Sequence, residues 1–296
     1  MAEKLRAGWI GTGVMGAPMA GHLLAAGYPL TVFNRTRSKA EGLLSKGAAW
    51  AATPAEVARQ SDVVFTIVGF PPDVQKTYFG PDGICAALRP GQIAVDMTTS
   101  PPSLAVEIAA AAAKAGASAL DAPVSGGQVG AVGAKLTIMA GGDRPSYDKV
   151  LPLFQKMGQA VTHIGPAGSG QHCKMVNQIL IAGNMLALAE SLAYTKECGL
   201  KPEAVLEAVS QGSAGSWCLK NLGPRILRGD FAAGFFVDHY VKDLGIAIGE
   251  AKRMKLALPM LALAEQLYVA LQAQGHGRLG TQAISKTYEA LNKRGA

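Results

Sequence analysis

The stretch Gly11-Thr12-Gly13-Val14-Met15-Gly16 decides the fold, because it has the pattern G-x-G-x-x-G between an apolar run and a helical pattern. Gly8-Trp9-Ile10 precedes it, and helix-forming residues follow over residues 15–26. In this setting the three glycines permit a tight turn, close approach of the backbone to a diphosphate, and close packing of helix on strand. The helix start adds amide donors and partial positive charge. A glycine-rich turn without a ligand is the alternative, but this order of elements favours dinucleotide binding.

The first half of the chain alternates strand and helix patterns. Apolar runs predict strands, and more polar or alanine-rich stretches predict helices over residues 38–46 and 105–115. This alternation is typical of a doubly wound α/β domain of the Rossmann type. The strands are expected at residues 30–33, 63–68, 93–96, 118–121 and 136–139.

The strand patterns fade after Gly170. Residues 171–198 contain no proline and only one glycine, which predicts a single long helix that ends before Gly199. Further helices are expected over residues 202–210, 241–254, 260–274 and 281–291. The sequence therefore predicts a dinucleotide-binding Rossmann domain over residues 1–165. An all-helical domain should follow over residues 166–296, and the long helix joins the two.

Composition excludes several classes of protein. The chain has 296 residues, of which 49% are hydrophobic and 17% charged, so it can bury a sizeable core. Its net charge of +7 comes from scattered Lys and Arg, which favours anionic small molecules over nucleic acid. The longest strongly apolar stretch, residues 179–189, is interrupted by Asn184, and no membrane span is expected. No secretory signal and no metal-ligand spacing is recognised, which favours a cytoplasmic protein without a metal.

The end of the second strand selects the cofactor. An NAD site usually carries Asp or Glu there to bind the ribose 2′-hydroxyl. This chain has Asn34, Arg35 and Thr36 instead, followed by a second arginine. Asn34 does not repel a phosphate, and Arg35 can bind one through two parallel hydrogen bonds. Solvated surface arginines are the alternative interpretation. We expect NADP to be preferred, with NAD as the other candidate.

The long helix begins with three polar residues on one face. Lys174, Asn177 and Gln178 are spaced i, i+3 and i+4. The positive end of the helix dipole disfavours a protonated ammonium, so Lys174 is a candidate proton donor and acceptor. On spacing alone, an exposed helical lysine would be the commoner explanation.

The chain resembles the β-hydroxyacid dehydrogenase family over essentially all of its length. That family includes 3-hydroxyisobutyrate dehydrogenase, tartronate semialdehyde reductase and, more distantly, 6-phosphogluconate dehydrogenase. Four segments carry the resemblance, namely residues 9–20, Asp121-Ala122-Pro123-Val124-Ser125-Gly126-Gly127, residues 168–178, and Val241-Lys242-Asp243-Leu244. It implies an oxidoreductase that uses NAD(P) and assembles as a homodimer or homotetramer.

The resemblance also implies roles for matching residues. Lys174 would be the catalytic acid and base, and Asn177 and Gln178 would orient the substrate oxygen, although some relatives have Asn in place of Gln178. The turn Ser125-Gly126-Gly127 would hold the substrate carboxylate, and successive amides there can form an anion site. Thr99 and Lys242 would lie beside the cofactor. The alternatives are an ordinary turn and, for Lys242-Asp243, a surface ion pair of little energetic value.

The substrate is expected to be a small semialdehyde carboxylate, interconverted with its 3-hydroxy acid. Residues 212–217 resemble a stretch of tartronate semialdehyde reductases, in which Ser213 and Ser216 could bind a substrate hydroxyl. This favours tartronate semialdehyde (2-hydroxy-3-oxopropionate). An apolar wall at Trp217 would instead suit 3-hydroxyisobutyrate or succinic semialdehyde, unless Trp217 is simply part of the core.

Competing functions are less well supported. The Tyr-x-x-x-Lys pattern of short-chain dehydrogenases is absent from the sequence, and imine reductases of similar sequence usually lack the lysine at the position of Lys174. An inactive dinucleotide-binding interaction protein is the rival from another class. Intact Lys174 and Asn177 argue against it.

Overall fold

A computed structural model describes residues 4–293 of the chain. By its internal contacts the chain divides into two compact units, which meet inside the long helix α8 (Ser169–Glu197) between Lys174 and Met175. We call them the N-terminal and the C-terminal unit. This division falls nine residues after Gly165, the predicted end of the first domain, so the first turns of α8 belong to the N-terminal unit.

The N-terminal unit is built on one mostly parallel sheet. Its strands are β1 (Ala7–Ile10), β2 (Leu30–Phe33), β3 (Ala49–Trp50), β4 (Val63–Thr66), β5 (Ile93–Asp96), β6 (Ser118–Asp121), β7 (Val124–Ser125), β8 (Leu136–Gly141) and β9 (Gly158–Gly165). The order β3-β2-β1-β4-β5-β6 is that of a Rossmann fold, and it confirms the predicted fold class. Strand β8 pairs antiparallel with β6 and β7 and parallel with β9.

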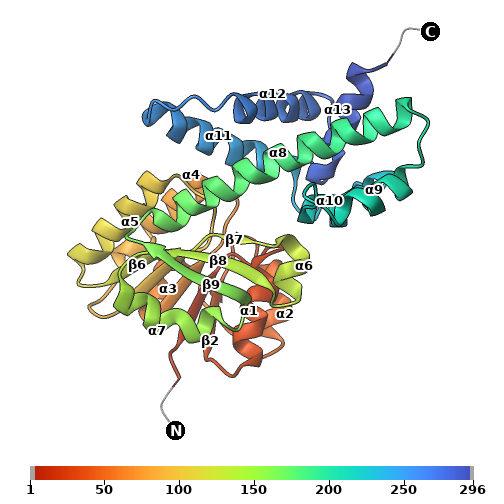
Figure 1. Ribbon diagram of the computed structural model, residues 1–296. Helices are drawn as coiled ribbons and strands as arrows, with labels where there is room; N and C mark the ends of the chain where they lie inside the picture. Colours follow the sequence, from red (N-terminus) through yellow and green to blue (C-terminus); the bar gives the residue numbers. More distant parts are fainter. Residues whose placement is uncertain (1–3, 294–296) are drawn as a thin grey trace. The chain divides into compact units, whose positions relative to one another are not determined.

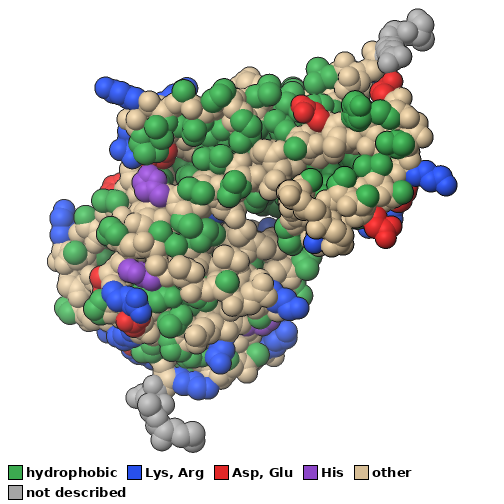
Figure 2. All heavy atoms as spheres, in the orientation of Figure 1, with side chains coloured by type: hydrophobic (Ala, Val, Ile, Leu, Met, Phe, Trp, Pro, Cys, Tyr) green, Lys and Arg blue, Asp and Glu red, His purple; other side chains and the backbone are tan. Residues whose placement is uncertain are grey.

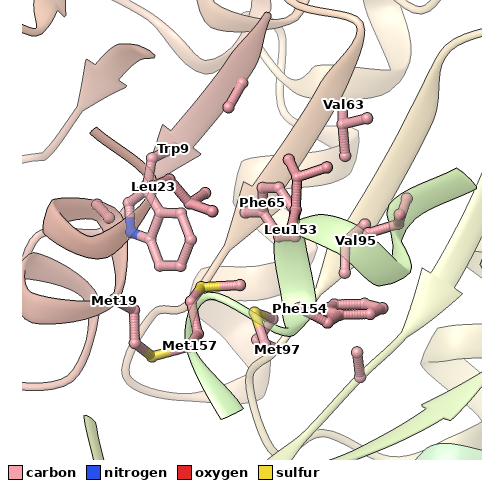
Figure 3. Packing of buried hydrophobic residues seen from close by; sticks show 14 of the residues in the cluster. Trp9, Met19, Leu23, Val63, Phe65, Val95, Met97, Leu153, Phe154 and Met157 are labelled. Carbon is pink, nitrogen blue, oxygen red and sulfur yellow. The ribbon is translucent and has the colours of Figure 1, made fainter. Parts of the chain in front are cut away.

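Helices cover both faces of this sheet, which explains why its strands are continuously apolar. On β4, Phe65 belongs to the core cluster of one face and Val64 to that of the other. In the first cluster Phe65 packs between Trp9 and Phe154, with ring centroids 5.4 and 6.1 Å away (Figure 3). The helices are α1 (Gly16–Ala25), α2 (Glu41–Leu44), α3 (Pro54–Gln60), α4 (Pro71–Phe79), α5 (Pro102–Lys114), α6 (Gly127–Val132) and α7 (Arg144–Phe154), with short 3₁₀ turns at Arg37–Ala40 and Ile84–Ala86.

The C-terminal unit is helical among its described residues. It contains the rest of α8, α9 (Pro202–Ser210), α10 (Trp217–Leu227), α11 (Val237–Arg253), α12 (Pro259–Ala273), a 3₁₀ turn (Thr281–Ala283) and α13 (Ile284–Leu291). Helices α11 and α12 lie side by side (Figure 1), and the perpendicular rings of Tyr240 and Tyr268, 4.8 Å apart, pack between them. The predicted all-helical second half is confirmed.

Several elements were not expected from the sequence. Strand β9 was missed because its residues are mostly exposed or half-buried, so it lacks an apolar run. Helices α3, α4 and α7 begin at or near prolines, and α10 contains Pro224, so each resembles a loop. Helix α11 begins four residues before the predicted start.

Helix α8 corrects one expectation about membranes. Asn184 does not interrupt it, and by length and composition alone its 29 residues could cross a membrane. However, 39% of its most apolar 18-residue window is buried inside the structure. Met185 and Leu188 belong to the hydrophobic core of the C-terminal unit. A core helix of a globular unit passes the same test, so α8 by itself does not indicate a membrane protein.

Candidate active site

The glycine loop has the geometry that a diphosphate requires. Gly11 has φ +97°, and a Cβ atom there would lie 2.9 Å from the carbonyl carbon of Ile67. Around Gly13 an added Cβ would meet nothing within 4 Å, which leaves room for a ligand at the backbone. A Cβ at Gly16 would lie 2.9 Å from a methyl carbon of Ile67, so α1 packs tightly on the strand end.

The start of α1 also has the donors that an anion needs. Met15 provides no side-chain cap, and the first turn has no acidic residue. The buried hydroxyl of Thr12 has no hydrogen-bond partner within residues 4–293, whereas Val14 is exposed. These residues fit the diphosphate of a dinucleotide.

The residues after β2 form an ordered turn beside this loop. The side-chain oxygen of Asn34 accepts a 2.9 Å hydrogen bond from the Thr12 amide, and its nitrogen donates to the Thr36 carbonyl. Arg35 is 87% exposed and lies 3.3 Å from Asp73. Asp73 was missed by sequence analysis. Its position just after Pro71-Pro72 could have indicated an acidic residue in the first turn of a helix. The sequence does not indicate that Arg35 is its partner.

A buried carboxylate lies at the end of β5, next to the loop that contains Thr99. Asp96 accepts hydrogen bonds of 3.0 Å from the Thr66 hydroxyl and the Thr98 amide. Burial raises the pKa of Asp96 to about 6, against the lowering effect of these donors. The Thr98 hydroxyl in turn accepts from the Val68 amide. Thr99 is half-buried in the same loop, which is therefore held to β4 and β5.

Lys174 is buried and points at the Ser125-Gly126-Gly127 turn. Lys174 is only 6% exposed, and its Nζ donates a 2.8 Å hydrogen bond to the carbonyl of Val124. Gly126 and Gly127 have φ +127° and +59°, which side-chain-bearing residues rarely adopt. The exposed-lysine interpretation is wrong. The structure brings the expected acid and base next to the expected carboxylate site.

A second polar network lies in the C-terminal unit. Asn177 donates to the Gln178 side-chain oxygen at 2.8 Å, and the Gln178 nitrogen donates to Asp243 at 2.5 Å. Asp243 is 1% exposed, and its other oxygen lies 2.7 Å from Lys242 Nζ. Asp243 is therefore buried and Lys242 half-buried, and the interpretation as a surface ion pair is wrong. Because both ends of the Gln178 amide are engaged, Gln178 is placed to orient Asn177.

The segment expected to recognise a substrate hydroxyl is largely exposed. The Ser216 hydroxyl accepts from the Leu219 amide at 3.0 Å and caps α10, a role that its position before an apolar helix could have indicated. Ser213 is exposed, and Trp217 is 63% exposed, so Trp217 is not a core residue. Within residues 4–293, no three His, Cys, Asp or Glu side chains are grouped so as to hold a metal ion.

Comparison with known protein families gives two matches that together span most of the chain. Residues 6–165 match the NAD-binding domain of 6-phosphogluconate dehydrogenase. Residues 168–288 match the family described as the NAD-binding domain of NADP-dependent 3-hydroxyisobutyrate dehydrogenase.

Individual relatives agree with these matches. A probable mitochondrial 3-hydroxyisobutyrate dehydrogenase-like protein of Arabidopsis thaliana is 54% identical, over 98% of this chain and 87% of that one. An NAD-dependent L-serine dehydrogenase of Pseudomonas aeruginosa and a 2-(hydroxymethyl)glutarate dehydrogenase of Eubacterium barkeri are each 36% identical, over at least 95% of both chains. The solved 3-hydroxyisobutyrate dehydrogenase of Mycobacterium tuberculosis with L-serine has a TM-score of 0.89 at 29% identity, covering 97% of this chain and 99% of that one.

Proposed function

This chain belongs to the β-hydroxyacid dehydrogenase family, and we propose that it is an NADP-preferring reductase of tartronate semialdehyde. The family fixes the coarser activity, which is NAD(P)-dependent oxidation and reduction between a hydroxy acid and its carbonyl form. The substrate and the cofactor preference are our proposal.

One observation carries the proposal. The buried ammonium of Lys174 donates to the carbonyl of Val124, the residue just before Ser125-Gly126-Gly127. A substrate whose carboxylate is held by the Ser125 hydroxyl and by backbone amides of this turn would place its carbonyl group near Nζ. A buried lysine next to a carboxylate site is what acid catalysis on an anionic aldehyde needs.

Residues of the chain have separate roles in this reaction. A nicotinamide dinucleotide held at the glycine loop, residues 11–16, would supply hydride transfer to or from the carbonyl carbon of the substrate. As the carbonyl π bond breaks in reduction, Lys174 Nζ gives its proton to the oxygen, and in oxidation it takes that proton back. Asn177, one helical turn along α8, orients the same oxygen. The Gln178–Asp243 pair fixes the Asn177 amide.

The case for NADP rests on the turn after β2. No acidic residue ends that strand, and the Arg35 guanidinium is exposed next to a loop that fits a diphosphate. Asp73 holds Arg35 from the start of α4, which can preposition the guanidinium over the ribose site. The matched family described as NADP-dependent agrees, whereas one relative is named as NAD-dependent.

The relatives' names narrow the substrate class. L-Serine, 3-hydroxyisobutyrate and 2-(hydroxymethyl)glutarate are all 3-hydroxypropanoates that differ in the group at carbon 2. Glycerate, the product from tartronate semialdehyde, has a hydroxyl there. We rank it first because residues 212–217 resemble a stretch of tartronate semialdehyde reductases, in which Ser213 and Ser216 could bind a substrate hydroxyl.

A substrate panel tests the proposal. We expect kcat/KM with NADPH to be highest for tartronate semialdehyde, compared with methylmalonate semialdehyde and succinic semialdehyde. A tenfold preference for either of the other two would overturn this ranking and leave the reductase assignment standing. Absence of turnover with every semialdehyde, despite NADPH binding, would favour an inactive dinucleotide-binding protein.

We also propose that the C-terminal unit pairs with a second copy of the chain. Val176, Leu180 and Tyr194 lie exposed along α8. Leu256 lies exposed just before α12, and Met260 and Leu263 lie exposed in its first turns. A Cβ at Gly183 would lie 3.4 Å from Met260, so the two helices adjoin. Figure 2 shows hydrophobic side chains gathered over the helices of this unit. Light scattering should report a dimer or tetramer, and Leu180→Glu with Leu263→Glu should shift it toward monomer.

A further inference from the structure

The start of α8 is capped by a carboxylate that lies far away in the sequence. Gly168 precedes the helix and has no side chain to act as a cap. Instead, Asp121 at the end of β6 accepts a 2.8 Å hydrogen bond from the Gly168 amide and another from the Gln171 amide. In a capping box two side chains satisfy these two donors. Here one buried carboxylate satisfies both.

Two glycines bring the helix start this close to the sheet. A Cβ at Gly141, the last residue of β8, would lie 2.6 Å from an Asp121 carboxylate oxygen and 2.7 Å from the Gly170 nitrogen. A Cβ at Gly170 would lie 2.5 Å from the Asp121 carbonyl oxygen. No side chain fits at either position, so the contact between Asp121 and α8 depends on both glycines.

The side chain of Gln171 makes a second connection from the same helical turn. Its oxygen accepts from the Ser100 amide at 3.1 Å, and its nitrogen donates to the Thr98 carbonyl at 2.7 Å. Gln171 is fully buried. The loop that it holds, residues 97–101, contains Thr99, the residue expected beside the cofactor.

We propose that Asp121 and Gln171 form a clamp that positions Lys174 relative to residues 97–101, the loop that contains Thr99. Both are positioning residues, because they act through the first turn of α8, and Lys174 follows Gln171 by three residues. Asp121 fixes the helix axis on β6, and Gln171 fixes its rotation relative to residues 97–101. The proposal rests on the proposed role of Lys174 and adds two residues to which no role in the reaction was assigned above.

Gln92 offers a matched control for Gln171. It is also a buried glutamine, and it joins separate segments at the opposite end of β5. Its nitrogen donates to the carbonyls of Ala58 and Ser61, and its oxygen accepts from the Arg89 amide. Gln171→Met and Gln92→Met both remove buried hydrogen bonds from the N-terminal unit while keeping side-chain volume. Only the first should affect Lys174.

The experiment compares the two variants in the full-length protein. For Gln171→Met we expect kcat to fall about 10- to 100-fold, the scale of a misplacement of about 1 Å, with the Kd of NADPH changed less than threefold. Amide hydrogen exchange over residues 168–174 should quicken at least tenfold. Gln92→Met should change kcat less than twofold and leave exchange over residues 168–174 within threefold. Equal effects of the two variants, or full kcat in Gln171→Met, would overturn the proposal.

A second pair covers the case in which Gln171→Met does not fold. Asp121→Asn removes one of the two acceptors, and Asp143→Asn alters the carboxylate that caps α7 through the Ser146 amide. We expect the same contrast in kcat and in exchange over residues 168–174, and equal results for the two variants would refute the clamp. If the unmodified enzyme turns over no semialdehyde, the proposed function fails. The exchange measurement still decides whether Asp121 and Gln171 hold the helix start.

Discussion

The side-chain nitrogen of Gln178 on α8 donates a 2.5 Å hydrogen bond to the carboxylate of Asp243 on α11, and this carboxylate also forms an ion pair with Lys242. The contact joins residues 65 positions apart in the sequence. Gln178 and Lys242, both expected at the site, therefore belong to one network around Asp243. In this network Asp243 determines the orientation of the Gln178 side-chain amide.

Asp243→Ala should therefore damage both stability and catalysis. Removal of one partner of a buried ion pair leaves the other charge uncompensated, and we expect the free energy of unfolding to fall by about 3 kcal/mol. The kcat of the folded fraction should fall at least tenfold, because Asn177 loses its fixed orientation. Urea denaturation and steady-state kinetics measure the two effects. Glu250→Ala, which breaks the more exposed pair with Arg253 on the same helix, should cost less stability and leave kcat unchanged.

Lys174→Ala should lower kcat by about 10²- to 10⁴-fold, the usual contribution of a general acid, and leave NADPH binding nearly intact. Lys174→Arg should fail as well, because a guanidinium does not give up its proton near neutrality. Steady-state kinetics with the chemical step rate-limiting, together with fluorescence titration of NADPH, measure both. Lys196→Ala, at the exposed far end of α8, is the control. Retention of more than about a tenth of kcat in Lys174→Ala would disprove the assigned role.

Arg35→Ala should lower kcat/KM for NADPH mainly through KM. Loss of one charge-assisted contact of roughly 1.5–3 kcal/mol corresponds to about a 10- to 150-fold loss. The efficiency with NADH should change little. Arg37→Ala is the matched control, because Arg37 lies over the Trp50 ring and near Glu41. If the unmodified enzyme used NADH as efficiently as NADPH, the proposed preference would be wrong.

The free energy of unfolding should depend on pH through the buried carboxyl group of Asp96. Its pKa is about 6 in the folded protein against 3.8 ordinarily, because burial disfavours the carboxylate. The folded state therefore binds this proton more tightly than the unfolded state, so this contribution to stability is lost as pH rises from about 4 to about 6. The loss is at most about 3 kcal/mol.

Asp96→Asn should flatten that dependence, since its side-chain oxygen can still accept from Thr66 and Thr98. Chemical denaturation at several pH values measures the slope. Burial also raises the pKa of Asp121, so part of the slope should remain in the variant. Asp62 has a lowered pKa because of its hydrogen bond with Arg6, so its contribution to stability is lost only below about pH 4, and Asp62→Asn should leave the slope between about pH 4 and 6 unchanged. An unchanged slope in Asp96→Asn would contradict the assignment.

The sequence by itself determined the features that depend on neighbouring residues. Apolar runs placed β2, β5 and β6 at their observed bounds, because a strand covered on both faces needs a continuous apolar stretch. The spacing of the glycines in residues 11–16 predicted the glycine loop, because the backbone conformation of a tight turn depends on the residues within it. The absence of proline over residues 171–198 predicted α8 to within two residues. The resemblance to a family supplied the role of Lys174, which spacing alone left ambiguous.

Only the tertiary structure decided which distant groups meet. Asp121 caps a helix that begins 48 residues later, and Gln171 holds a loop more than 70 residues earlier. The structure also buries Asp243 beside a half-buried Lys242 and leaves Trp217 exposed, which rules out the alternatives of a surface ion pair and a core tryptophan. The physical reason is that a buried polar group must find a partner wherever the fold brings one. That partner is set by strand order and helix packing, which local sequence does not encode.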